Sequence, residues 1–188
     1  MVSVIEYLAQ LGQLVEGLKT KEQFITRLVD EIVARAIEGQ QVIVFGNGGS
    51  AATASHFVCD LCNSSGADGR PKVKGLCLSD NIPMFTAWAN DDSYDTVFAQ
   101  QLNIYCSPGD LVIAISGSGN SSNVIKGIET AKNKKAICFG LCGFNGGQLA
   151  KLADEAIIIP GQNIQQAEDV HLVILHLVAL LVKERLKG

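Results

Sequence analysis

The stretch that most constrains the fold is an apolar run that ends abruptly in small polar residues. Residues 111–115 are Leu, Val, Ile, Ala and Ile, with no polar residue among them. A short run that is rich in β-branched side chains and does not alternate is typical of a strand buried on both faces, as in a parallel sheet. Serines, glycines and one asparagine fill residues 116–121, and apolar residues at helical spacing follow from Ser122. The order of strand, loop and helix predicts an α/β protein.

The loop after this strand has the features of an anion site. The first turn of a helix carries N–H groups without partners, and its dipole is positive at that end. Ser116, Ser118 and Ser121 add hydroxyl groups. Gly117 and Gly119 let the backbone approach a ligand closely. The loop contains no lysine, so it is not the phosphate-binding loop of nucleotide-binding proteins.

We therefore predict a pocket for the phosphate of a small metabolite at residues 116–121. The alternative interpretation is an ordinary serine–glycine turn in which a serine caps the next helix. This loop alone leaves both interpretations open.

A second unit of the same kind occurs earlier in the chain. Residues 41–45 form an apolar run, Gly46-Asn47-Gly48-Gly49-Ser50 follows, and a helix is expected from Ala51. The glycines lack the spacing of a dinucleotide-binding fingerprint. Two such loops in one parallel sheet lie at the same edge, where the strands end and where open α/β sheets bind ligands. The pair of loops therefore predicts a ligand site more strongly than either loop alone.

The remaining pattern completes an alternation of strands and helices. Three further strands are expected at residues 73–78, 135–141 and 156–159, and a long final helix at residues 165–186. Amphipathic patterns at residues 3–18 and 21–38 predict a helical hairpin before the first strand. The connections are short, which favours a doubly wound sheet. We expect a single domain over residues 1–188, made of the hairpin (1–38) and an αβα core (41–188).

Composition narrows the classes of function. The 188 residues are 47% hydrophobic, which is enough for a large core and favours some burial between subunits. The net charge of −4 gives no basis for general nucleic-acid binding. The N-terminus lacks the basic region of a signal peptide, and the apolar run at residues 170–182 is too short to cross a membrane. We therefore expect a cytoplasmic protein whose six cysteines are reduced thiols, without a membrane partner.

Two groups of side chains could carry chemistry on the helix after the first loop. His56 and Asp60 are four residues apart and share one face of this helix, as two metal ligands or an acid–base pair would. The alternative is a surface His–Asp pair. Cys59 and Cys62 have Cys-x-x-Cys spacing, but they lie a few turns inside the helix, whereas a redox motif is expected at a helix N-terminus.

The final helix holds a few polar residues in a largely apolar sequence. Buried charged groups are costly unless they are paired or bind a metal, so Glu168 and His176 have either a function or mutual partners. They lie about 80° apart around the helix and about 12 Å along it, so both can line one pocket. His171 points elsewhere and is expected to be a core or interface residue.

The residues named above resemble the SIS (sugar isomerase) domain family, and within it the phosphoheptose isomerase branch. The resemblance rests on residues 46–51, 89–91 and 115–124 and on the acidic-then-histidine pattern of the final helix. It extends from the N-terminal helices to the last helix. It implies a three-layer αβα sandwich, like that of flavodoxin, with a five-stranded parallel sheet. It also implies a homotetramer with active sites at subunit interfaces.

The activity implied by the resemblance is an aldose–ketose isomerisation through an enediol, often with zinc. The implied reaction converts sedoheptulose 7-phosphate into D-glycero-D-manno-heptose 7-phosphate, or acts on a similar sugar phosphate. The resemblance assigns the phosphate to Ser116, Gly117, Ser118 and Ser121. It assigns the sugar to Asn47, Gly48, Gly49, Ser50, Asn90, Asp91 and Glu168.

The metal ligands implied by the resemblance are His56, Asp60, Glu168 and His176. Asp60 stands where the branch has a glutamate that is also its catalytic base, and Glu168 stands where the branch has a glutamine. Asp60 or Glu168 is therefore expected to be the base, with His176 as the partner acid–base. The competing hypothesis is a non-catalytic SIS protein, either a sugar-phosphate sensor or an adaptor in replication initiation. His176 favours the enzyme, because a binding protein needs no general acid there.

Overall fold

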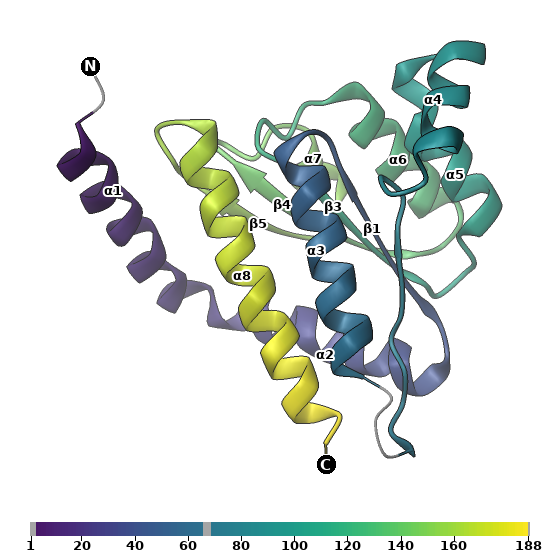
Figure 1. The fold of residues 1–188 in the computed structure, drawn as a ribbon, viewed down its shortest axis with the longest axis horizontal. Coiled ribbons are helices and arrows are strands. Elements are labelled where there is room, and N and C mark those ends of the chain that lie inside the picture. The colour runs from purple at the N-terminus through teal and green to yellow at the C-terminus, as the bar shows by residue number, and fades with distance from the viewer. Residues whose placement is uncertain (1–2, 66–68, 188) are drawn as a thin grey trace.

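The structure is a computed structural model that describes residues 3–65 and 69–187 (Figure 1). Five strands form one sheet in the order β2-β1-β3-β4-β5, and every neighbouring pair is parallel. The strands are β1 (Gln41–Gly46), β2 (Lys74–Cys77), β3 (Leu111–Ser116), β4 (Ile137–Gly143) and β5 (Glu155–Ile159). The helices are α1 (Val4–Gly17), α2 (Glu22–Glu38), α3 (Gly49–Ser64), α4 (Ile82–Asp91), α5 (Val97–Tyr105), α6 (Ser122–Asn133), α7 (Leu149–Leu152) and α8 (Ile164–Arg185), with short 3-10 turns η1 (Leu18–Lys21) and η3 (Tyr94–Thr96).

The two faces of the sheet are covered by different helices. Val42 and Val44 of β1 pack with α2, α3 and α8, whereas Ile43 and Phe45 pack with α5 and α6. This alternation is the period of two of a strand, and because both faces are covered the strand reads as a continuous apolar run. The expected three-layer sandwich with a five-stranded parallel sheet is therefore confirmed.

The central strands send their helices to opposite faces. β1 leads into α3, which joins the core cluster with α8, and β3 leads into α6, which joins the other cluster. β1 and β3 are direct neighbours, with Gly46 in register with Ile115. The point between them is therefore the switch point at which an open α/β sheet has a crevice.

The helix α8 is a core helix, although its length and composition would also suit a membrane span. It packs along α3 and α2, and its residues Ile174, Leu175 and Val178 are fully buried (Figure 1). This packing explains why an apolar pattern runs almost around the helix.

The N-terminal helices lie at the expected positions, but α1 runs beside α8 rather than closing on α2 (Figure 1). α1 buries none of its residues, and Val4, Ile5 and Leu8 are at least 60% exposed. Polar contacts hold it to the start of α8: the Tyr7 hydroxyl donates to Asp169 over 2.7 Å, and the Gln166 amide donates to Gln10 over 2.9 Å. α1 thus depends on few contacts within its own chain.

Candidate functional site

The two small-residue loops meet at the carboxyl edge of the sheet. A Cβ atom on Gly46 would lie 2.8 Å from the Ile115 carbonyl oxygen. The ends of β1 and β3 can therefore approach this closely only because residue 46 is glycine. Between the loops lies a cavity of about 90 Å³. Its lining residues are Asn47, Ser50, Ile115, Ser116, Gly117, Ser118, Ser121, Ile164 and Glu168. Seven of the eleven residues expected to contact the substrate thus line one cavity, although they come from segments far apart in sequence.

Both helices that start at the cavity have N-termini without a side-chain cap. Ser121 is at the N-cap position of α6, but its hydroxyl accepts no hydrogen bond from the first turn. Instead it lies 3.4 Å from the Ser116 hydroxyl. The N-cap of α3 is Gly48, which has no side chain to offer. In α3 the Ala51 N–H already donates to the carbonyl oxygen of Gly48 over 3.0 Å. The first-turn N–H groups of α6 and the positive dipole ends of both helices are left for an anion, which favours the anion site over the capped turn.

Helix α8 closes the cavity with two side chains. A Cβ atom on Gly49 would lie 2.6 Å from Oε2 of Glu168, and one on Gly117 would lie 2.7 Å from Cγ1 of Ile164. Glycine at both positions lets α8 approach the loops. Burial raises the pKa of the Glu168 carboxyl group, and the charge of the adjacent Asp169 raises it further. This carboxyl group therefore takes up a proton more readily than an exposed one.

A histidine–aspartate cluster lies farther along the same two helices. Nε2 of His56 is 3.7 Å from Oδ2 of Asp60, and Nε2 of His176 is 3.8 Å from the same oxygen. The two imidazole rings have centroids 4.8 Å apart in an edge-to-face arrangement. The cluster forms because α3 and α8 pack side by side.

This cluster is a group that can hold a metal ion. Its three ligand atoms lie within 4.8 Å of one another. Two imidazoles and a carboxylate are a donor set that suits zinc, and three protein ligands leave a coordination position open for a substrate. Glu168, expected as a fourth ligand, is not a member of the group in the described part of the chain and lines the serine cavity instead.

The remaining expected contacts to the sugar come from the end of α4. The Asn90 amide donates to the Asp91 carboxylate over 2.8 Å, and both side chains are exposed. Neither residue lines the cavity. The next turn reaches the site, because the Tyr94 hydroxyl donates to Oδ1 of Asn47 over 3.0 Å.

Several residues at the site had no role assigned from the sequence. Asn123 exchanges hydrogen bonds with Asn47, Tyr94 binds Asn47, and Ile164 covers Gly117. Asn123 belongs to the 115–124 motif, which was the only available signal for it. Tyr94 and Ile164 stand in no motif, and their roles depend on contacts distant in sequence.

Two other candidate groups have structural explanations. His171 is fully buried, and burial lowers its pKa to about 4, with the backbone of Cys142 opposing this in part. It is therefore a neutral core residue, as expected. Cys59 and Cys62 are exposed free thiols in the interior of α3, away from a helix N-terminus.

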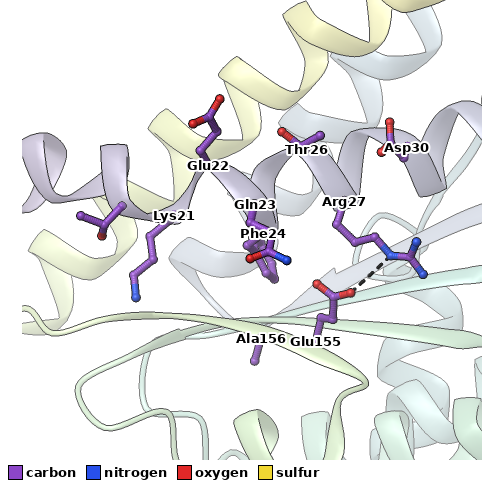
Figure 2. Close-up of a pocket in the computed structure, with 10 residues that line it drawn as sticks. Lys21, Glu22, Gln23, Phe24, Thr26, Arg27, Asp30, Glu155 and Ala156 are labelled. Carbon is purple, nitrogen blue, oxygen red and sulfur yellow. Dashed lines mark ion pairs between the residues drawn. The ribbon is translucent and has the colours of Figure 1, made fainter.

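A larger hollow of about 900 Å³ lies at the opposite end of β5, beneath η1 and α2 (Figure 2). Its arginine is paired with two carboxylates. Nη2 of Arg27 lies 3.0 Å from Oε1 of Glu31, and Nε lies 3.3 Å from Oε1 of Glu155. We assign it no chemistry.

The match to a family model now defines the class of protein. Residues 6–143 match the SIS domain, so the chain belongs to the SIS domain family, as expected from its loops. It is 38% identical over 161 residues to the probable phosphoheptose isomerase of Thermoplasma acidophilum, which covers 86% of this chain and 88% of the relative. It is 37% identical over 173 residues to the phosphoheptose isomerase of Aneurinibacillus thermoaerophilus, with 90% and 86% covered.

Solved structures share the fold. The phosphoheptose isomerase of Neisseria gonorrhoeae superposes with a TM-score of 0.89 at 23% identity, covering 96% of this chain and 97% of that one. A phosphoheptose isomerase from Francisella tularensis gives a TM-score of 0.85 at 23% identity, covering 97% and 100%. At this identity the likeness establishes the fold.

Proposed function

We propose that the protein is a sugar-phosphate isomerase that interconverts a ketose and an aldose. The proposed reaction converts sedoheptulose 7-phosphate into D-glycero-D-manno-heptose 7-phosphate. One observation carries the proposal: an uncapped serine loop and a histidine–aspartate cluster lie along the same helix, α8, in a chain that is 38% identical to a probable phosphoheptose isomerase.

The serine loop is proposed to hold the phosphate. Its hydroxyl groups and the first-turn N–H groups of α6 donate to phosphate oxygens, and the dipoles of α3 and α6 stabilise the charge. The phosphate residues are Ser116, Gly117, Ser118 and Ser121, and the sugar residues are Asn47, Gly48, Gly49, Ser50, Asn90, Asp91 and Glu168.

The histidine–aspartate cluster is proposed to perform the proton transfers. A base removes a proton from C1 of the ketose, the electron pair moves to the C2 carbonyl oxygen, and an enediol forms after that oxygen is protonated. Return of a proton to C2 and loss of one from the C1 hydroxyl give the aldose. Asp60 is assigned as the base because it lies 3.8 Å from His176, which exchanges protons with the two oxygens. Glu168 stays the alternative base, since burial raises the pKa of its carboxyl group.

A zinc ion is the proposed metal for His56, Asp60 and His176. When bound, it would supply Lewis-acid polarisation of the substrate oxygens. For Glu168 we propose a contact to the sugar rather than to the metal, because this residue lines the serine cavity.

The proposed assembly is a homotetramer with active sites between subunits. α1 exposes Val4, Ile5 and Leu8, and α8 exposes Leu180 to 62%. A groove of about 560 Å³ between η1, α2 and α8 is lined by Val15, Leu18, Lys19, Glu22, Ile25, Thr26, Val29, Val173, Leu177, Leu181 and Arg185. An apolar surface of this kind favours burial against another copy. The proposed location is the cytoplasm, without a nucleic-acid or membrane partner.

The test is an isotope experiment in deuterium oxide. Sedoheptulose 7-phosphate is incubated with the protein, with and without zinc, and products are followed by NMR. We expect an aldose 7-phosphate that carries deuterium at C2. If no deuterium is taken up and no aldose forms, the isomerase is refuted. Tight binding of the sugar phosphate without turnover would support the non-catalytic sensor instead.

A further inference from the structure

Asn123 has a buried side-chain amide in α6, the helix that follows the second loop. This amide hydrogen-bonds to Asn47 in the first loop. It lies in the first turn of α6 and is only 2% exposed. Nδ2 of Asn47 donates to its Oδ1 over 2.8 Å, and its own Nδ2 donates to Oδ1 of Asn47 over 2.9 Å. This reciprocal pair joins residues 76 positions apart.

The contacts of Asn47 leave one donor free. A carboxamide oxygen has two lone pairs and the amide nitrogen has two hydrogens. The Asn47 oxygen accepts from Asn123 and from the Tyr94 hydroxyl, over 2.9 and 3.0 Å, so both lone pairs are used. One N–H donates to Asn123, and the described residues offer no acceptor to the other. Asn47 lines the serine cavity, so the free N–H is available to a ligand there.

We propose that Asn123 is a positioning residue that fixes the carboxamide of Asn47 with an N–H directed at the bound sugar phosphate. This role rests on the proposed function, because it takes the sugar phosphate as the occupant of the cavity. Without Asn123 the Asn47 amide loses two hydrogen bonds and can rotate. A rotated amide presents its oxygen to an anionic ligand, which is repulsive. The pair also ties the first loop to the helix that carries Ser121.

A double-mutant cycle tests the role. Affinity for sedoheptulose 7-phosphate is measured by calorimetry for the wild type, Asn123→Leu, Asn47→Ala and the double variant. Asn123→Leu is expected to weaken binding about tenfold, the equivalent of one or two hydrogen bonds. If Asn123 acts through Asn47, its substitution has no further effect in the Asn47→Ala background. Additive losses, or unchanged affinity in Asn123→Leu, would overturn the proposal.

The matched control is Gln101→Met. Gln101 is also a buried amide, at 1% exposure, but it donates only to the backbone carbonyls of Leu78 and Val97. Its substitution removes buried hydrogen bonds of a similar kind without touching Asn47. We expect it to lower the melting temperature about as Asn123→Leu does, with affinity unchanged. Equal losses of affinity in both variants would show that Asn123 is merely structural.

A measurement on the wild type keeps the proposal testable if Asn123→Leu does not fold. The side-chain amide protons of Asn47 are followed by NMR while inorganic phosphate or sedoheptulose 7-phosphate is added. One of the two protons is expected to shift strongly, and a response of neither or of both would contradict the fixed orientation. The outcomes separate the two proposals. Binding with this response but no turnover leaves the positioning role intact and refutes the isomerase, whereas turnover with an additive cycle refutes only the positioning role.

Discussion

The small cavity at the carboxyl edge and the large hollow beneath α2 differ in how their polar groups are satisfied. The hollow is about ten times larger, at about 900 against 90 Å³, yet its Arg27 is already paired with Glu31 and Glu155. At the cavity, two helices begin without side-chain caps. The Ser116 and Ser118 hydroxyls accept backbone N–H groups over 3.1 and 3.2 Å, and their contacts with other serine hydroxyls are long, at 3.4–3.5 Å. Helix N-termini without side-chain caps, rather than volume, therefore distinguish the candidate site from the hollow. Four predictions break or sharpen this contrast.

The largest effect is expected from the cluster beside the cavity. Asp60→Asn removes the proposed base while keeping the shape, and we expect a loss in kcat of about 10²–10⁴-fold, the usual contribution of general acid–base catalysis. The measurement is the initial rate of aldose formation at saturating substrate. The same loss in Glu168→Gln, with Asp60→Asn fully active, would move the base to Glu168.

The second prediction concerns pH and stability at the buried histidine under the carboxyl edge. The folded-state pKa of His171 is about 4, below its ordinary value of about 6.5, so the unfolded chain takes up a proton first as pH falls. Stability from this residue is therefore complete above about pH 6.5 and declines toward pH 4, by about 3 kcal/mol at most. The free energy of unfolding, measured by urea titration at several pH values, should fall more steeply with falling pH in the wild type than in His171→Phe. The same pH dependence of the unfolding free energy in both proteins would contradict the prediction.

The third prediction sharpens the role of the loop backbone. Gly119 has φ +65°, and a Cβ there would lie 2.2 Å from the carbonyl oxygen of Gly146. Gly119→Ala must therefore move the loop, with an expected cost of about 1–3 kcal/mol and weaker phosphate binding. Gly12→Ala is the matched control, because a Cβ at Gly12, inside α1, meets nothing within 4 Å. Thermal melts and phosphate titrations of both variants check this, and equal behaviour would refute it.

The smallest effect is expected at the hollow. Glu155→Gln breaks a half-exposed ion pair with Arg27, and such pairs contribute less than about 1 kcal/mol. We expect an unchanged KM and kcat and a melting temperature close to that of the wild type. A loss of isomerase activity here would show that the hollow has a function and would break the contrast.

The sequence was informative where local patterns decide the structure. The apolar runs predicted the five strands, and the small residues after 45 and 115 predicted the two loops that line one cavity. Both are local consequences of burial on two faces and of glycine close to a neighbouring strand. The spacing of His56 and Asp60 likewise predicted a shared helix face, now seen in their 3.7 Å contact.

Features that depend on packing between distant segments were not predictable in this way. Periodicity identified α1 as a helix but not its position beside α8, which depends on contacts distant in sequence. These are the Tyr7–Asp169 hydrogen bond and the packing of Leu11 and Leu14 against the core. Helical geometry placed Glu168 and His176 on one side of α8, but only the position of α3 decides which of them meets Asp60. The pairing of Asn123 with Asn47 needs the register of β1 and β3, which no local pattern encodes.

The divergence of α3 and α6 to opposite faces of the sheet has a consequence for how such a protein can evolve. In the proposed site, the phosphate serines precede α6, whereas the histidine–aspartate cluster lies on α3 and α8. Substitutions that reshape selectivity for the carbon chain can therefore accumulate in one layer while anchorage of the charged end is preserved in the other. The same fold can in this way change its sugar substrate while it keeps the binding site for the phosphate that these substrates share.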